Sequence, residues 1–192
     1  DMQANSGVTN LGVNNTKSAD LLRDLINNQA TRSSVSTADL ITLGIGFNDF
    51  GAARLKFYNS TCGGSDNQDC LRDAVSTFIG NWDLIITEIK SLNTKPTTAF
   101  RAMDIYLNLP YVVGDFATIN PYLTQMNNHI NSYSSTNGFL VAQVHTAFNG
   151  PNGDESPNNK GYIGADSIHP NDLGHKTIAE KFFEALKEYF KK

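Results

Sequence analysis

The chain has 192 residues, of which 40% are hydrophobic and 18% are charged, and its formal net charge is -4. This length and composition lie outside the range of disordered chains, so we expect one globular domain over residues 1–192. The acidic balance disfavours binding to nucleic acid, and no apolar run approaches the roughly 18 residues of a membrane span.

Short apolar runs rich in β-branched residues predict buried strands, and apolar residues three or four apart predict helices between them. In chain order the expected elements are a strand over residues 7–13, a helix capped by Ser18, a strand over 39–46, a helix over 71–92, a strand over 100–107, a helix from about Asn120 with Pro121 in its first turn to Tyr133, a strand over 139–144, and a helix with Ile178, Phe182, Phe183, Leu186 and Phe190 on one face.

Strands that alternate with helices and read as continuous apolar runs favour a parallel sheet covered on both faces. The sequence therefore predicts an α/β fold, a three-layer α/β/α sandwich. In such sheets ligands bind at the carboxyl ends of the strands. The segments to search for chemistry are residues 14–18, 47–50, 108–114 and those from His145 onward.

Cys62 and Cys70 flank a polar, glycine-containing loop whose spacing fits no zinc or redox motif. We expect a disulfide between them, and hence an exported protein; two free thiols are the alternative.

Residues 44–49 (GIGFND) place Asn48 and Asp49 where an apolar strand breaks at two glycines. Taken alone, this pattern is more typical of a turn with local side-chain hydrogen bonds than of a catalytic site. It becomes a candidate active site only if a catalytic partner exists elsewhere in the chain.

The partner is residues 166–171 (DSIHPN), at the entrance to the last helix. An aspartate three residues before a histidine can accept the Nδ1–H of the imidazole and leave Nε2 free as a general base. The alternative is that Asp166 caps a turn and His169 is an exposed loop histidine.

Together and in this order, the two motifs resemble the SGNH hydrolases, the GDSL-type esterases and lipases, over Thr9 to Phe183. The resemblance implies a flavodoxin-like sheet. It also implies that Asn48 donates its amide to an oxyanion, that His169 is the general base and acid, and that Asp166 orients His169. Asp49 is expected to be structural.

Residues 10–22 are similar to the second block of that family, with Asn15 in place of its usual glycine. The backbone N–H at this position completes the oxyanion hole of the family. Asparagine tolerates left-handed backbone geometry better than most residues, so we expect Asn15 to keep this role.

The family's nucleophile block, Gly-Asp-Ser-Leu or similar, is missing from these residues. Ser6 precedes a predicted strand instead of following one, and Ser156 lies in a loop with no strand before it. Either the sequence is part of a longer enzyme and lacks the first strand with its serine turn, or the protein is a relative without a nucleophile that binds esters or glycans.

The expected function is hydrolysis of short acyl or acetyl esters by a serine acyl-enzyme mechanism, with a small-molecule ester as the partner. There are two alternatives: a non-catalytic binding module, and an acyl or acetyl transferase or deacetylase acting on carbohydrate.

We expect no cofactor and no catalytic metal, because the four histidines show no ligand spacing. His129 and His145 are expected to be packing or surface residues, and Tyr111, Asp115 and Phe116 are guesses for an acyl pocket.

Overall fold

The computed structural model describes residues 7–108 and 115–190. Seven helices and three strands form within these residues. They are α1 (Ser18–Asn27), α2 (Gln29–Thr37), β1 (Leu40–Leu43), α3 (Phe47–Tyr58), α4 (Asp69–Leu92), β2 (Ala99–Met103), α5 (Asp115–Asn137), β3 (Leu140–Ala142), α6 (Val144–Asn149) and α7 (Asp172–Phe190).

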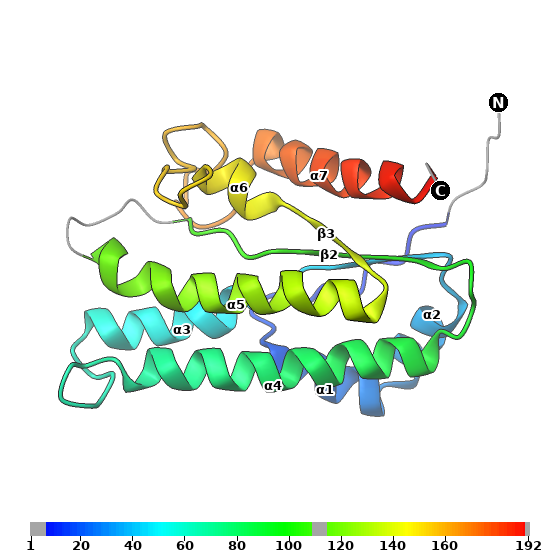
Figure 1. Ribbon diagram of the computed structural model, residues 1–192, viewed down its shortest axis with the longest axis horizontal. Coiled ribbons are helices and arrows are strands. Elements are labelled where there is room, and N and C mark those ends of the chain that lie inside the picture. Colours follow the sequence, from blue (N-terminus) through cyan, green and yellow to red (C-terminus); the bar gives the residue numbers. More distant parts are fainter. Residues whose placement is uncertain (1–6, 109–114, 191–192) are drawn as a thin grey trace.

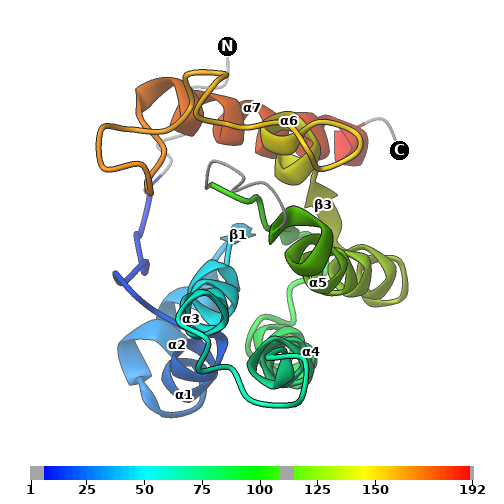
Figure 2. The ribbon, with the colours of Figure 1, turned by 90° about the vertical axis from the view of Figure 1, so that its left-hand side faces the viewer.

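The three strands form one parallel sheet in the order β1-β2-β3. Leu40 of β1 lies opposite Ala99 of β2, and Arg101 of β2 lies opposite Leu140 of β3. Figures 1 and 2 show α6 and α7 on one side of the sheet and α1 to α5 on the other. The predicted α/β fold with a parallel sheet between helical layers is therefore confirmed.

The long helix α4 supplies the largest apolar face of the core. Its buried residues are the seven that the sequence predicted, Leu71, Val75, Phe78, Trp82, Ile85, Ile86 and Ile89. Fully buried Trp82 contacts Phe78, with 5.6 Å between ring centroids, and Phe139, which precedes β3, at 6.3 Å. Helices α1, α3 and α5 all pack on α4, so α4 is the central helix of the layer on this side of the sheet.

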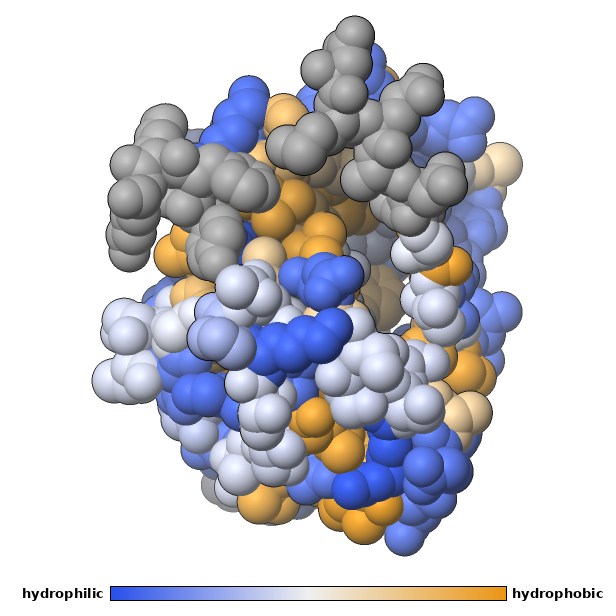
Figure 3. All heavy atoms as spheres, turned by 90° about the vertical axis from the view of Figure 1, so that its right-hand side faces the viewer, coloured by the Kyte–Doolittle hydropathy of each residue, from blue (hydrophilic) through white to orange (hydrophobic). Residues whose placement is uncertain are grey.

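Residues 7–13, predicted as a strand, form no strand in the structure. Val8 and Val13 are 89% and 68% exposed. A strand needs a neighbour to satisfy its backbone, and within the described residues β1 pairs with β2 alone. The outer edge of β1 is consequently open there, and Leu40 is 44% exposed. Figure 3, which views the side of the molecule where both termini lie, shows apolar side chains at the hollowed surface.

The predicted boundaries differ from the observed ones at several points. The three strands are shorter than predicted, because the backbone leaves the sheet at Gly44, after Met103 and after Ala142. Lys17, not Ser18, is the N-cap of α1. α5 begins at Asp115, so Pro121 lies inside the helix.

In α7, Phe183 is 58% exposed instead of facing the sheet, and its ring lies 4.7 Å from the Nζ of Lys187.

Helices α2, α3 and α6 were not predicted. They are short, and their apolar pattern is weaker than that of α4.

The loop between α3 and α4 is closed by the expected disulfide between Cys62 and Cys70, whose Cα atoms are 4.8 Å apart. The backbone N–H of Cys70 also donates to the carbonyl of Cys62.

The described part of the chain contains no helix with the length and apolarity to cross a bilayer.

Candidate active site

The turn from β1 into α3 presents Asn48 and Asp49 at the carboxyl end of the sheet. Gly46 is the N-cap of α3 and has φ of +109°. A Cβ atom there would come within 2.5 Å of the Cδ1 of Ile105 and 2.6 Å of the Cε2 of Phe78, so the turn requires glycine. The helix begins at once with Phe47, and Asn48 and Asp49 therefore lie in its first turn and not in a β-turn.

Asn48 and Asp49 hold the segment that leads into α1. The side-chain amide of Asn48 donates to the carbonyl of Thr16 at 3.1 Å. The carboxylate of Asp49 accepts from the backbone N–H of Ser18 at 2.9 Å and from its hydroxyl at 2.5 Å. Asn81 of α4 donates to the same hydroxyl at 2.9 Å, so Ser18 is buried and fully engaged. Asp49 thus has the structural position that the sequence suggested.

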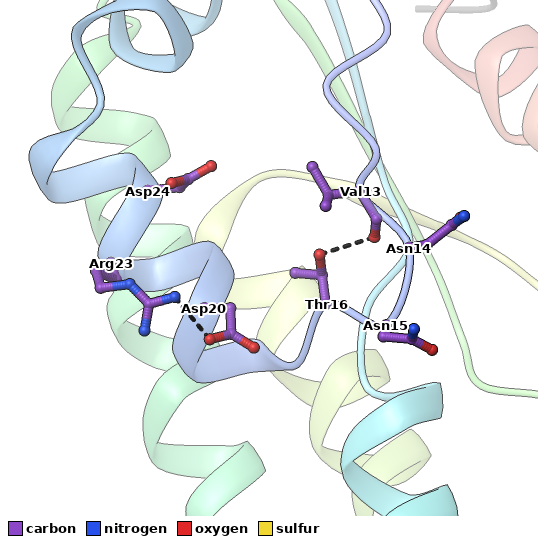
Figure 4. A pocket seen from close by; sticks show the side chains of 7 residues that line it. All are labelled: Val13, Asn14, Asn15, Thr16, Asp20, Arg23 and Asp24. Carbon is purple, nitrogen blue, oxygen red and sulfur yellow. Dashed lines mark hydrogen bonds and ion pairs between the residues drawn. The ribbon is translucent and has the colours of Figure 1, made fainter.

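Asn15 adopts the left-handed backbone conformation that was expected of it, with φ of +61°. It lines an open hollow of about 220 Å³ between the segment before α1 and the first turns of that helix (Figure 4). The lining residues are Val13, Asn14, Asn15, Thr16, Asp20, Arg23 and Asp24. The hollow is mainly polar, and Arg23 forms an ion pair with Asp20 at 2.8 Å within it.

The loop before α7 brings Asp166 and His169 together. Oδ2 of Asp166 lies 2.6 Å from Nδ1 of His169, and Oδ1 accepts the backbone N–H groups of Ile168 and His169, both at 3.0 Å. These bonds lower the pKa of Asp166 to about 2, the bond from His169 contributing most. The His169 side chain is 75% exposed. Because its Nδ1 faces the carboxylate, Nε2 is the nitrogen left for a substrate.

Tyr106 follows β2 and is buried near both parts of the site. Its ring contacts that of Phe47, the neighbour of Asn48, with 5.5 Å between centroids. Burial and, to a lesser degree, the negative charge of Asp166 raise the pKa of Tyr106 to about 12. The phenol therefore stays neutral, and the effect of Asp166 on its pKa shows that the loop before α7 lies near Tyr106.

Tyr106 was not singled out from the sequence, although the chain after β2 was expected to border the site. The signal that could have found Tyr106 and Asn108 is their position after β2, at the carboxyl end of the parallel sheet. Of the guessed pocket residues, Phe116 is half-buried, Tyr111 lies outside the described residues, and the side chain of Asp115 is likewise not described.

His129 and His145 lie away from the loop that carries His169. Nε2 of His129 on α5 contacts the Asp83 carboxylate of α4 at 2.6 Å. His145 is in the first turn of α6, and burial lowers its pKa. Residues 7–108 and 115–190 contain no group of three or more histidine, cysteine, aspartate or glutamate side chains arranged to hold a metal ion.

Asp104, directly after β2, is a buried carboxylate that should make folding stability depend on pH. It is 3% exposed and accepts the backbone N–H of His145 at 2.7 Å. Desolvation raises its pKa from 3.8 to about 6. The folded state therefore holds the proton more tightly than the unfolded state. The resulting stabilisation of the folded state is complete below about pH 4. It is lost as the pH rises through 6, and the free energy of unfolding then falls by about 3 kcal/mol.

Urea unfolding of the wild type and of Asp104→Asn between pH 4 and 7 measures how much Asp104 contributes to the pH dependence of stability. The asparagine keeps a carbonyl acceptor but does not titrate, so the difference in unfolding free energy between the two proteins should shift by up to about 3 kcal/mol in favour of the variant as the pH rises. A difference that stays constant across the range would contradict the assignment.

Comparison with solved structures assigns the fold class. A lipase from a goat rumen metagenome superposes with a TM-score of 0.71 and 20% identity over 88% of this chain and 73% of its own. Phospholipase A1 from Streptomyces albidoflavus NA297 has a TM-score of 0.58, 16% identity and coverage of 91% and 76%. The extracellular lipase from Streptomyces rimosus has a TM-score of 0.56 and 18% identity, with coverage of 91% of this chain and 76% of its own. The chain thus has the three-layer α/β fold of these lipases.

The family model of GDSL-like lipases and acylhydrolases matches residues 2–177. The chain therefore belongs to the GDSL-like lipase/acylhydrolase family, as its motifs suggested. None of the curated proteins matches the chain significantly.

Proposed function

We propose that this protein hydrolyses short acyl or acetyl esters through a serine acyl-enzyme. The observation that carries the proposal is the 2.6 Å contact between Oδ2 of Asp166 and Nδ1 of His169. This contact holds the imidazole in the tautomer whose Nε2 is basic, which is the requirement for activating a serine hydroxyl. The family's ester-hydrolysing chemistry matches this arrangement.

Each residue then has a defined role in the reaction. His169 takes the proton from the serine hydroxyl as the serine oxygen attacks the ester carbonyl, and it returns that proton to the leaving alcohol. It next takes a proton from water as the water oxygen attacks the acyl carbon, and it gives this proton to the serine oxygen as the bond between serine and the acyl group breaks and the acid leaves. The amide of Asn48 and the backbone N–H of Asn15 donate to the oxyanion of each tetrahedral intermediate.

The serine in this proposal comes from outside the 192 residues. Ser18, the serine closest in sequence to Asn15, is buried and bonded to Asp49 and Asn81, so it is unsuited to attack a substrate. The open edge of β1 in the described structure and the exposed Leu40 beside it support a further strand at this position, and such a strand would end near Asn48.

Export belongs to the same proposal. The disulfide between Cys62 and Cys70 suits an oxidising compartment.

The deciding experiment is the denatured intact mass of the protein purified from its natural source, before and after treatment with a fluorophosphonate. We expect a mass above 21.0 kDa and a single adduct, which should be absent in a recombinant His169→Ala variant of the same full-length protein. A mass of 21.0 kDa without an adduct would exclude the serine mechanism and favour a non-catalytic binding module.

A further inference from the structure

The chain that follows β2 is held by asparagine side chains in place of neighbouring strands. The amide of Asn127 on α5 accepts from the N–H of Ile105 at 2.8 Å and donates to its carbonyl at 2.9 Å. Asn149 of α6 bonds both backbone groups of Leu107 in the same way, each at 2.8 Å. Both asparagines are buried, so these bonds fix residues 105–107 as a rigid extension of the sheet.

Asn108 stands at the end of this extension and reaches the loop that carries Asp166 and His169. It is 3% exposed. Its side-chain amide donates to the carbonyl of Ile168 at 3.0 Å and, more weakly, to that of Ser167 at 3.4 Å. The backbone carbonyl of Asn108 accepts from the side-chain amide of Asn158 at 3.1 Å. The peptide groups just before His169 are thereby attached to the sheet.

The loop needs such an attachment because its catalytic side chains are exposed. The side chains of Asp166 and His169 are 50% and 75% exposed, and exposed pairs are weakly held by their own contact. Ser167 between them has φ of +60°, an unfavourable conformation for a residue with a side chain. The backbone bonds to Asn108 join this strained turn to a buried, rigid element.

We propose that Asn108 is a positioning residue that keeps His169 aimed at its substrate and paired with Asp166. This inference rests on the catalytic role proposed for His169. Asn108 touches neither substrate nor the reacting atoms, and it acts through the backbone of Ser167 and Ile168.

The test is the tautomer of His169, read from its ring 15N chemical shifts by NMR in the full-length protein at a pH where the imidazole is neutral. In the wild type the Nδ1–H form should dominate, because Asp166 accepts that proton. In Asn108→Ala we expect this form to fall from the majority to the minority. His175, exposed on α7, provides an internal reference in the same spectra.

The matched control is Asn93→Ala, which also removes a side-chain amide that donates to two backbone carbonyls, those of Val35 and Ala38, but lies outside the anchor of the loop. It should lower stability and leave the tautomer of His169 unchanged. If Asn108→Ala fails to fold, Asn108→Ser shortens the side chain and should give a partial loss of the Nδ1–H form. An unchanged tautomer in a folded Asn108 variant, or an equal loss in Asn93→Ala, would overturn the inference.

A kinetic arm separates this inference from the proposed function. In the ester-hydrolysing protein with its serine, Asn108→Ala should lower kcat about tenfold or more and leave KM nearly unchanged, because misaimed catalytic groups slow chemistry and not binding. Full activity in His169→Ala would reject the proposed function, whereas a wild-type kcat in Asn108→Ala would reject only the positioning role.

Discussion

Replacement of His169 by alanine is expected to abolish ester hydrolysis and to leave the fold intact. Loss of the general base should lower kcat roughly 10⁴-fold in the protein with its serine, because neither the serine nor the attacking water is then deprotonated. The side chain is 75% exposed, so the melting temperature should change little. Hydrolysis of a chromogenic short-chain ester and a thermal unfolding scan measure the two effects.

His175→Ala provides the control for this experiment. His175 is another exposed histidine, in the first turns of α7, and it takes no part in the proposed reaction. Its variant should keep wild-type kcat. A His169→Ala protein with unchanged turnover, or one that loses stability in place of activity, would identify His169 as an ordinary loop residue.

Replacement of Asn48 by alanine is expected to lower kcat about 10²- to 10³-fold, which corresponds to roughly 3–4 kcal/mol of lost transition-state stabilisation. One N–H of the amide is fixed on the carbonyl of Thr16, which leaves the second to donate to the oxyanion. Since that bond strengthens as charge develops, the effect should fall on kcat and not on KM. Steady-state kinetics with one short-chain ester separate the two parameters.

The alanine variant of Asn81 tests whether the effect is local to the oxyanion. Asn81 supports the same segment through the hydroxyl of Ser18 but does not border the proposed oxyanion position. If Asn48 acted only by ordering residues 14–18, the two variants would lose similar activity. We expect Asn81→Ala to retain most of the wild-type kcat.

The fold was predictable where the signal lies within one element. The apolar repeat along α4 predicted every residue that this helix buries. The strand expected at residues 7–13 was wrong, because strand formation depends on a partner that is distant in sequence and the local apolar pattern does not report one. The early start of α5 was hidden for a similar reason, since Pro121 is a local start signal that packing overrides.

The candidate site was predictable where residues are close in sequence. The contact between Asp166 and His169 follows from their spacing, and the left-handed Asn15 follows from the tolerance of asparagine for that conformation. The contributions of Tyr106 and Asn108 were not predictable, because they depend on where the chain after β2 passes relative to the loop before α7. The catalytic roles of His169, Asp166, Asn48 and Asn15 stay predictions.

The asparagine pairing of Leu107 has a consequence for chemical ageing. Asn149 precedes Gly150, and an asparagine before glycine is the sequence most prone to deamidation in flexible chains. Conversion of Asn149 to aspartate would replace the N–H that donates to the Leu107 carbonyl by a second acceptor, and the two oxygens would repel each other in a buried position. The bonds that hold the amide also restrain it from the cyclisation that deamidation requires, so the durability of this chain on storage depends on the same contacts that extend its sheet.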